Sequence, residues 1–119
     1  MEYTLILAIV QDIDAGRLNQ ALAAAGVRCT RLNTVGGFLR ERNVAFLIGA
    51  PLTEVDRILQ IIAETCHTRT VLYAPPFGEP AIFSDVVEVE VGGAVVFVLP
   101  VERVVTLQGQ MAATRRTLR

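Results

Sequence analysis

Arg28 and Thr30 are the residues of this sequence whose types and spacing best suit binding of a phosphate group. They lie two positions apart in "VRCTRLNTV" (27–35), a segment in which apolar and polar residues alternate. The alternation predicts a half-exposed strand, in which residues two apart point to the same side. A guanidinium and a hydroxyl on one side of a strand donate hydrogen bonds to a phosphate, and those from the guanidinium are charge-assisted. We therefore expect the polar side of this strand to be available for a ligand.

The residues after this strand suggest a cover for a flat ring. Gly36 and Gly37 form a turn, and the apolar pair Phe38 and Leu39 follows it, outside any expected core. Together with Asn43, this pair can fold back over the polar side of the strand. A phosphate held beneath an apolar lid fits a nucleotide, whose ring the lid would cover. A second interpretation stays open at this point, in which Phe38 and Leu39 only cap a contact between copies of the chain.

The sequence contains no pattern typical of an enzyme. Asp12 and Asp14 follow the first expected strand, but helix capping explains Asp14, and no histidine or nucleophile is near them in sequence. His67 is the only histidine and follows a helix end, whose dipole it can complement. Cys29 and Cys66 lack metal or redox spacing and are expected to be buried thiols. No glycine-rich phosphate-binding motif occurs, so we predict a protein without enzyme activity, metal or cofactor.

Composition narrows the class of protein further. The 119 residues fit one domain, and the net charge of −1 gives no reason to expect nucleic acid as a partner. The longest apolar runs, 5–10 and 94–101, are much shorter than the roughly 18 residues of a membrane helix. No signal peptide pattern precedes the first strand, which favours the cytoplasm. The hydrophobic fraction of 52% exceeds what a small core uses, so we expect a closed homo-oligomer.

The order of the expected elements predicts an α+β fold. The apolar strand 3–10 should be central in a sheet, and the helix 14–26 should begin at Asp14 as N-cap and stop at Gly26. Strands follow at 27–35 and 43–50 as a hairpin, then a helix at 52–66 with Thr53 as N-cap, and a short strand at 68–74. This β-α-β-β-α-β order predicts the ferredoxin-like arrangement, with both helices on one face of a four-stranded sheet.

Additional strands are expected after this unit. A Pro- and Gly-rich loop at 75–85 precedes the segment 86–101, which reads as two strands broken at Gly92 and Gly93. We therefore divide the chain into a domain at 1–107 and a polar, flexible tail at 108–119.

The sequence resembles the cyclic-di-AMP receptor family of the PII-like signal-transduction superfamily. The resemblance is carried, in order and spacing, by "LAIVQDID", "VRCTRLNTVGGFL", "RNVAFLIG" and "VEVEVGGAVVFVLPVE". It implies a homotrimer of ferredoxin-like subunits with additional C-terminal strands, which binds the cyclic dinucleotide in clefts between neighbouring subunits. By position, it implies a ligand-binding set of Arg28, Thr30, Gly36, Gly37, Phe38, Leu39, Asn43, Gly49 and Phe97, some of it from the neighbouring chain.

The chain departs from the family pattern at three positions. Gly26 stands where the family often has asparagine, and Val104 and Thr106 stand where relatives have an aromatic residue and a glutamine. The alternatives are therefore a PII-like trimer that binds another adenine nucleotide (ATP, ADP or AMP), and a structural or protein-interaction trimer without a ligand. In the receptor interpretation, ligand binding orders the 36–42 loop and the 75–85 flap and changes a surface presented to an unidentified downstream protein.

Overall fold

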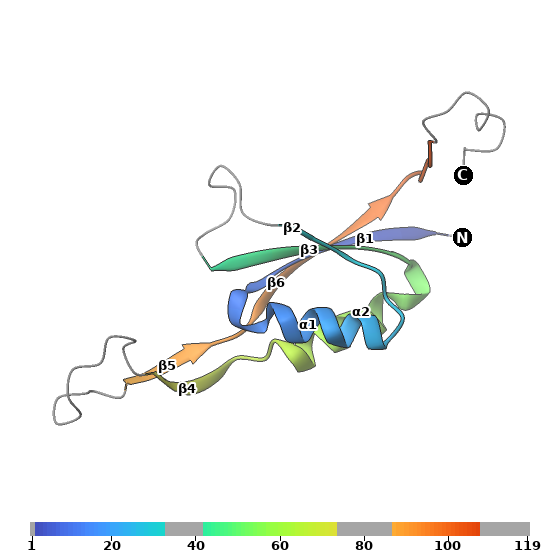
Figure 1. Cartoon of the computed structure of the whole chain (residues 1–119). Helices are drawn as coiled ribbons and strands as arrows, with labels where there is room; N and C mark the ends of the chain where they lie inside the picture. The colour runs from blue at the N-terminus through green and yellow to red at the C-terminus, as the bar shows by residue number, and fades with distance from the viewer. Residues whose placement is uncertain (1, 33–41, 74–86, 108–119) are drawn as a thin grey trace.

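The computed structural model describes residues 2–32, 42–73 and 87–107 and has mixed α/β architecture with antiparallel sheets (Figure 1). Its elements, in chain order, are β1 (Tyr3–Gln11), α1 (Asp12–Ala24), β2 (Thr30–Leu32), β3 (Asn43–Pro51), a 3-10 turn (Leu52–Glu54), α2 (Val55–Thr65), β4 (Arg69–Tyr73), β5 (Val87–Val91) and β6 (Ala94–Val101).

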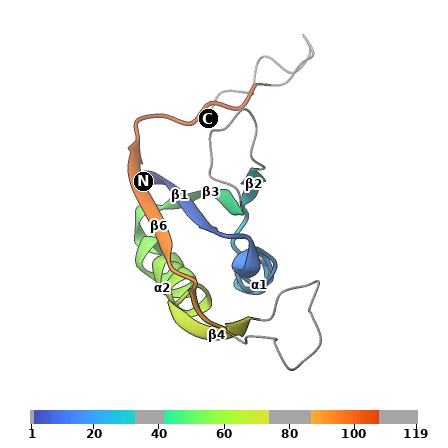
Figure 2. The ribbon, with the colours of Figure 1, turned by 90° about the vertical axis from the view of Figure 1, so that its left-hand side faces the viewer.

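The main sheet has four antiparallel strands in the order β2-β3-β1-β6, and both helices cover one of its faces (Figure 2). Along β1, Ile6, Ala8 and Val10 are buried and pack with apolar residues of the two helices. The alternate residues point to the opposite face and are only half-buried. The prediction that this strand is central is confirmed. Within the described residues of one chain, the helices cover only one of its two faces.

Helix α1 begins earlier than predicted and ends where predicted. Its first residue is Asp12, and Asp14 lies inside the first turn as a buried residue, so the prediction of Asp14 as N-cap is wrong. At the other end, Gly26 adopts a left-handed φ of 76°. The backbone N–H of Val27 then donates to the carbonyl of Leu22 at 2.8 Å, which closes a Schellman motif.

Helix α2 buries the predicted face but starts differently. Val55, Ile58 and Ile62 are buried, and Leu59 packs against the same core. Thr53 lies in the preceding 3-10 turn and makes no capping hydrogen bond, so the prediction of Thr53 as N-cap is wrong. A 3-10 turn tightens the chain on its way from β3 into the helix and removes the need for a side-chain cap.

The main difference from the predicted fold concerns the fourth strand of the sheet. We expected residues 68–74 at this position, but β4 pairs with β5 in a separate two-stranded sheet, which we call the ribbon. The place beside β1 is taken by β6, whose eight residues from Ala94 to Val101 pair with β1 along its length. The longer apolar strand covers more of β1 than the five residues of β4 could.

The other predicted strands are present. The hairpin of β2 and β3 is confirmed, with β2 shorter than the predicted 27–35. The break between the two C-terminal strands is also confirmed, because Gly92 and Gly93 have φ values of 97° and 87°. In the described part of the chain, no helix has the length and apolar character needed to cross a membrane.

Candidate functional site

The sheet register places Thr30 and Phe97 in one row on the face away from the helices. Thr30 on β2 is opposite Leu47 on β3, Leu47 is opposite Leu7 on β1, and Leu7 is opposite Phe97 on β6. Residues that are opposite one another in a sheet project from the same face. Thr30 and Phe97 therefore belong to one surface, which we call the outer face, but they lie on the two edge strands of the sheet.

Two more predicted residues share the outer face. Asn43 and Gly49 are an even number of residues from Leu47 on β3, so they point to the same side of the sheet. A Cβ atom added at Gly49 would lie 3.2 Å from Cε2 of Tyr3, so the glycine lets the Tyr3 ring lie close to the β3 backbone. Gly49 is nevertheless exposed.

Arg28 lies just before β2, with its side chain exposed. Arg28 and Gly49 line the same hollow, which has a volume of about 180 Å³. A second arginine from α2, Arg57, also lines it and is held in place by Glu54 at 2.8 Å and by the carbonyl of Ala25 at 3.2 Å. The hollow therefore joins two of the predicted ligand residues to an ion pair, Arg57–Glu54, that the sequence pattern did not indicate.

The remaining predicted site residues cannot be placed. Gly36, Gly37, Phe38 and Leu39 lie outside the described residues, as do the segments 75–85 and 108–119. Of the predicted set, the structure thus brings Thr30, Asn43, Gly49 and Phe97 to one face and joins Arg28 to Gly49 in one hollow.

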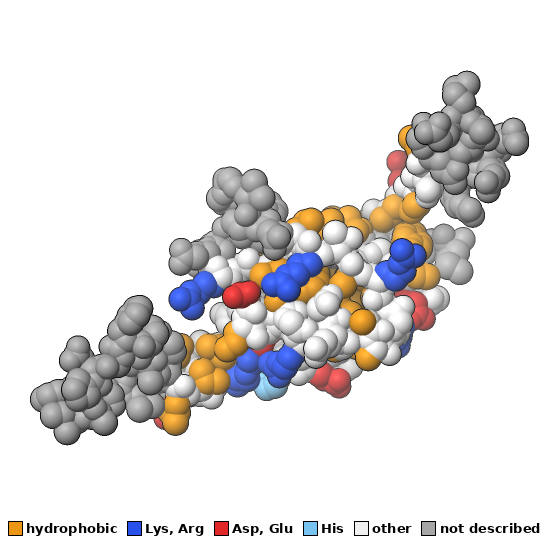
Figure 3. All heavy atoms as spheres, viewed as in Figure 1, with side chains coloured by type: hydrophobic (Ala, Val, Ile, Leu, Met, Phe, Trp, Pro, Cys, Tyr) orange, Lys and Arg blue, Asp and Glu red, His pale blue; other side chains and the backbone are white. Residues whose placement is uncertain are grey.

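The outer face is strongly apolar towards β6. Val95, Phe97 and Leu99 alternate along this edge strand, and Phe97 is 48% exposed. Hydrophobic side chains also gather along the sheet side of the molecule in Figure 3. A contiguous exposed apolar surface of this kind is typical of a contact with another molecule.

A buried ion cluster lies at the opposite side of the fold, where α1 meets the ribbon. The Asp14 carboxylate is 0% exposed and accepts hydrogen bonds from Arg69 at 2.7 Å and from Arg17 at 2.8 Å. Burial alone raises the pKa of Asp14, but the hydrogen bonds and charges of the two arginines outweigh it, so this pKa lies below its ordinary value. With both arginines engaged, the cluster serves as a structural tie between α1 and β4.

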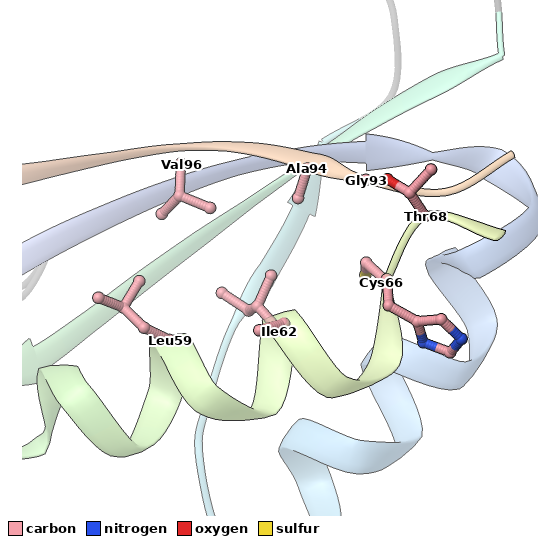
Figure 4. Close-up of a pocket in the computed structure, with 9 residues that line it drawn as sticks. Leu59, Ile62, Cys66, Thr68, Gly93, Ala94 and Val96 are labelled. Carbon is pink, nitrogen blue, oxygen red and sulfur yellow. The ribbon is translucent and has the colours of Figure 1, made fainter.

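A second hollow, about 300 Å³ in volume, lies between α2 and β6 (Figure 4). Leu59, Ile62 and Cys66 point from the helix side towards Ala94 and Val96 on β6. Burial, with the nearby Asp14 charge, raises the pKa of the Cys66 thiol to about 11. The thiol is therefore protonated at neutral pH and unsuited to nucleophilic chemistry. None of the predicted ligand residues that the structure describes lines this hollow.

The single histidine also has a structural position. Nδ1 of His67 lies 3.1 Å from the carbonyl oxygen of Glu64, in the last turn of α2. This contact agrees with the prediction that His67 complements the helix end. In the described ranges no three His, Cys, Asp or Glu side chains gather in a way that could hold a metal ion.

Together, the fold and the outer face define a small α+β domain with antiparallel sheets and a surface suited to binding. The chain belongs to the cyclic-di-AMP receptor family, whose model matches residues 3–107. A solved structure of a functionally unknown protein from Pediococcus pentosaceus ATCC 25745 is similar, with 39% sequence identity and a TM-score of 0.71. The similarity covers 87% of this chain and 96% of that one. The family assignment confirms the resemblance identified in the sequence and favours binding over catalysis.

Proposed function

We propose that the protein is a non-enzymatic, PII-like signal-transduction protein that binds cyclic-di-AMP in clefts between the subunits of a homotrimer. The family assignment supports the ligand. The observation that carries the shared cleft is the position of Thr30 and Phe97 at opposite edges of the outer face.

The separation of these residues favours a site built from two chains. Three interstrand spacings of about 4.8 Å separate their positions, that is about 14 Å. A ligand on the outer face of one chain would have to extend across all four strands to contact both residues. When the β2 edge of one subunit meets the β6 edge of the next, Phe97 lies close to Arg28 and Thr30.

The size of the hollow beside Arg28 supports the same geometry. Its volume of about 180 Å³ is smaller than the roughly 300 to 1,000 Å³ typical of a site for a drug-sized ligand. A neighbouring subunit would supply the missing wall. The apolar residues of β6 are suited to this role because they are exposed in the single chain. The two edges of the sheet differ, so the contact is heterologous, and three copies would form a ring when the rotation between neighbouring subunits closes.

Isothermal titration of the purified protein with cyclic-di-AMP tests the ligand, with cyclic-di-GMP, ATP and AMP as controls. We expect micromolar or tighter binding of cyclic-di-AMP alone, at one per subunit. Sedimentation equilibrium of the same sample should give the mass of a trimer. No binding of any nucleotide by a trimer would overturn the receptor function and leave the ligand-free interaction trimer.

The alternative of another adenine nucleotide has one specific observation in its favour. Gly26 lines the hollow beside Arg28, and no atom lies within 4 Å of a Cβ built on it. Gly26 thus leaves open space where the family often has asparagine, and the side-chain hydrogen bond of that asparagine is lost. Binding of ATP or AMP instead of cyclic-di-AMP in the titration would support this alternative.

A further inference from the structure

The junction between β1 and α1, formed by Gln11 and Asp12, contacts two distant parts of the chain. Gln11 is the last residue of β1 and is paired with Asn43 at the start of β3. The backbone N–H of Asp12 donates a hydrogen bond to the carbonyl of Arg42 at 2.6 Å. The junction is therefore bonded to the backbone of Arg42 and paired with Asn43, which is one of the predicted ligand residues.

The same junction holds the base of the ribbon. Oε1 of Gln11 accepts a hydrogen bond from the backbone N–H of Gly92 at 2.8 Å. Gly92 directly follows β5, and a Cβ atom there would lie 2.3 Å from the carbonyl oxygen of His67. Only a glycine allows this close approach, so Gly92 is held between Gln11 and the residues that precede β4.

The ribbon depends on such contacts for its orientation. Within the described residues, β4 and β5 pair with each other and with no strand of the main sheet. In Figures 1 and 2 the ribbon leads away from the helices and the sheet. A two-stranded sheet is marginally stable by itself, so its direction is set mainly by the hydrogen bonds at its base.

Arg42, next to the junction, has an uncommon backbone conformation. Its φ is 74°, a left-handed value that few residues with a side chain adopt. The bond from Asp12 and the pairing at Asn43 are restraints on this backbone. When either restraint changes, Arg42 can relax to an ordinary backbone conformation.

We propose that Gln11 and Asp12 form a relay that couples the backbone state at Arg42 and Asn43 to the position of the ribbon. The peptide between the two residues is planar and rigid, so a movement of the Asp12 N–H also moves the Cα atom that carries the Gln11 side chain. Gln11 then shifts its bond to Gly92. Because coupling is reciprocal, a partner that holds the ribbon also changes the backbone next to Asn43.

The role of a ligand in this relay depends on the proposed function, whereas the relay itself does not. A nucleotide that contacts Asn43 would favour one state of Arg42 and so one position of the ribbon. In this way the relay would link an occupied cleft to a surface that a downstream protein can recognise. Gln11 is a positioning residue in this scheme, since it acts through Gly92.

The first test uses Asp12→Pro, which removes the N–H that bonds Arg42. Proline is favoured at the first position of a helix, and Gln11 has φ −78° and ψ 148°, which suits a residue before proline. The matched control Asp12→Ala removes the carboxylate and keeps the N–H. We expect the hydrogen exchange rates of the ribbon amides to change by roughly fivefold or more in Asp12→Pro only. Equal rates in the two variants would overturn the relay.

The second test cuts the other end of the relay. Gln11→Leu removes the acceptor for Gly92, while Gln11→Glu keeps an oxygen at this place. We expect Gln11→Leu to change ribbon exchange and Gln11→Glu to preserve it, and we expect Asp12→Pro to add nothing in the Gln11→Leu background. Additive effects of the two changes would contradict the relay. If Asp12→Pro does not fold, the comparison of ribbon exchange in Gln11→Leu and Gln11→Glu still tests the relay.

The ligand arm uses cyclic-di-AMP, with binding measured separately by titration. In the wild-type protein, saturating ligand should slow ribbon exchange, while Gln11→Leu should bind ligand without this change. Absence of binding would refute the proposed function. Hydrogen exchange of the variants without ligand would still test the relay. Binding that leaves ribbon exchange unchanged in the wild-type protein would overturn the relay as a ligand-driven switch.

Discussion

The carboxylate of Asp14 on α1 lies 2.7 Å from the guanidinium of Arg69 on β4, a residue 55 positions later in the chain. This pair connects the first turn of a helix to the base of the ribbon. Asp14 is fully buried, so the pair is shielded from water on the side of the acid. Loss of one partner would leave a buried charge without its pair, which costs more stability than loss of a typical surface ion pair.

Replacement of Asp14 by asparagine should destabilise the fold. The neutral amide keeps the size of the side chain but loses charge-assisted hydrogen bonds to Arg69 and Arg17. We expect the free energy of unfolding, measured in urea, to fall by about 2 kcal/mol. The exposed Asp56 on α2 provides the control, since Asp56→Asn should leave this free energy nearly unchanged. Equal effects of the two substitutions would contradict a structural role for the cluster.

The Asp14 carboxylate should make the free energy of unfolding depend on pH in the acidic range. Its pKa in the folded protein is lower than the ordinary value of 3.8, so the folded state favours the charged form. The stability that Asp14 contributes is present above pH 3.8 and is lost as the pH falls through the lowered pKa. Urea unfolding between pH 6 and pH 2.5 should therefore show a steeper loss in the wild-type protein than in Asp14→Asn. Parallel curves would exclude this contribution.

Arg28 should contribute directly to ligand affinity. A charge-assisted contact contributes about 1.5 to 3 kcal/mol, so Arg28→Ala should raise the dissociation constant for cyclic-di-AMP roughly ten- to hundredfold. Arg31 is a matched control, because it is also exposed but projects from the opposite face of β2. Arg31→Ala should leave the constant within about twofold of the wild-type value. An unchanged constant in Arg28→Ala would remove Arg28 from the site.

Phe97 should contribute from the neighbouring subunit. Stacking of a base on an aromatic ring is worth about 1 to 3 kcal/mol, so Phe97→Ala should weaken binding about 5- to 150-fold. When Arg28→Ala and Phe97→Ala subunits are dissociated and reassembled together, about a quarter of the shared clefts should contain both intact residues. The mixture should then regain tight binding at about that stoichiometry. No recovery would show that both residues serve the same cleft from one chain.

The two cysteines should differ strongly in reactivity. Cys29 is half-buried, whereas Cys66 is buried and has a pKa raised to about 11. In the native protein at pH 8, a thiol reagent should label Cys66 at least about a hundredfold more slowly than Cys29, because Cys66 reacts only after the fold opens. A Cys29→Ser variant isolates the slow thiol. Similar rates in the two single-cysteine proteins would mean that the hollow between α2 and β6 admits the reagent.

The raised pKa of Cys66 has the opposite consequence for stability at alkaline pH. The folded state favours the neutral thiol, so its contribution is complete below the ordinary pKa of 9.0 and is lost as the pH rises towards about 11. Cys66→Ala should flatten the stability profile in this range. A profile identical to that of the wild-type protein would contradict burial of the thiol.

Much of the fold follows from patterns within short segments. The apolar run of β1, the helical spacing of Val55, Ile58 and Ile62, and the glycine stop at Gly26 each predict a local structure that the fold confirms. These patterns depend on neighbours within a few residues, which sequence reasoning captures well.

The errors concern choices between distant segments. Periodicity identifies β4 and β6 as strands but does not say which of them pairs with β1. The length of the apolar run in β6 decides that competition. Asp14 likewise fits a helix cap by local rules, and only the fold brings Arg69 close enough to hold it inside the helix as a buried acid.

The candidate site was predictable to a similar extent. Alternation in 27–35 predicted that Arg28 and Thr30 share one side of a strand, and the resemblance added Gly49 and Phe97. Arg57 and Gln11 carried no sequence signal, because their importance arises from a hollow and a hydrogen bond formed with residues far along the chain.

The free edge of β6 also sets a condition on how the protein must be produced. Within the described residues, one edge of β6 is unpaired. A newly synthesised chain therefore exposes the backbone of an eight-residue apolar strand at the rim of its sheet. Such an edge recruits any other extended segment and is a starting point for aggregates. Assembly of the proposed trimer and aggregation would thus compete for one surface. Rapid encounter of matching copies, for example of chains released from the same polysome, would decide the yield of soluble protein.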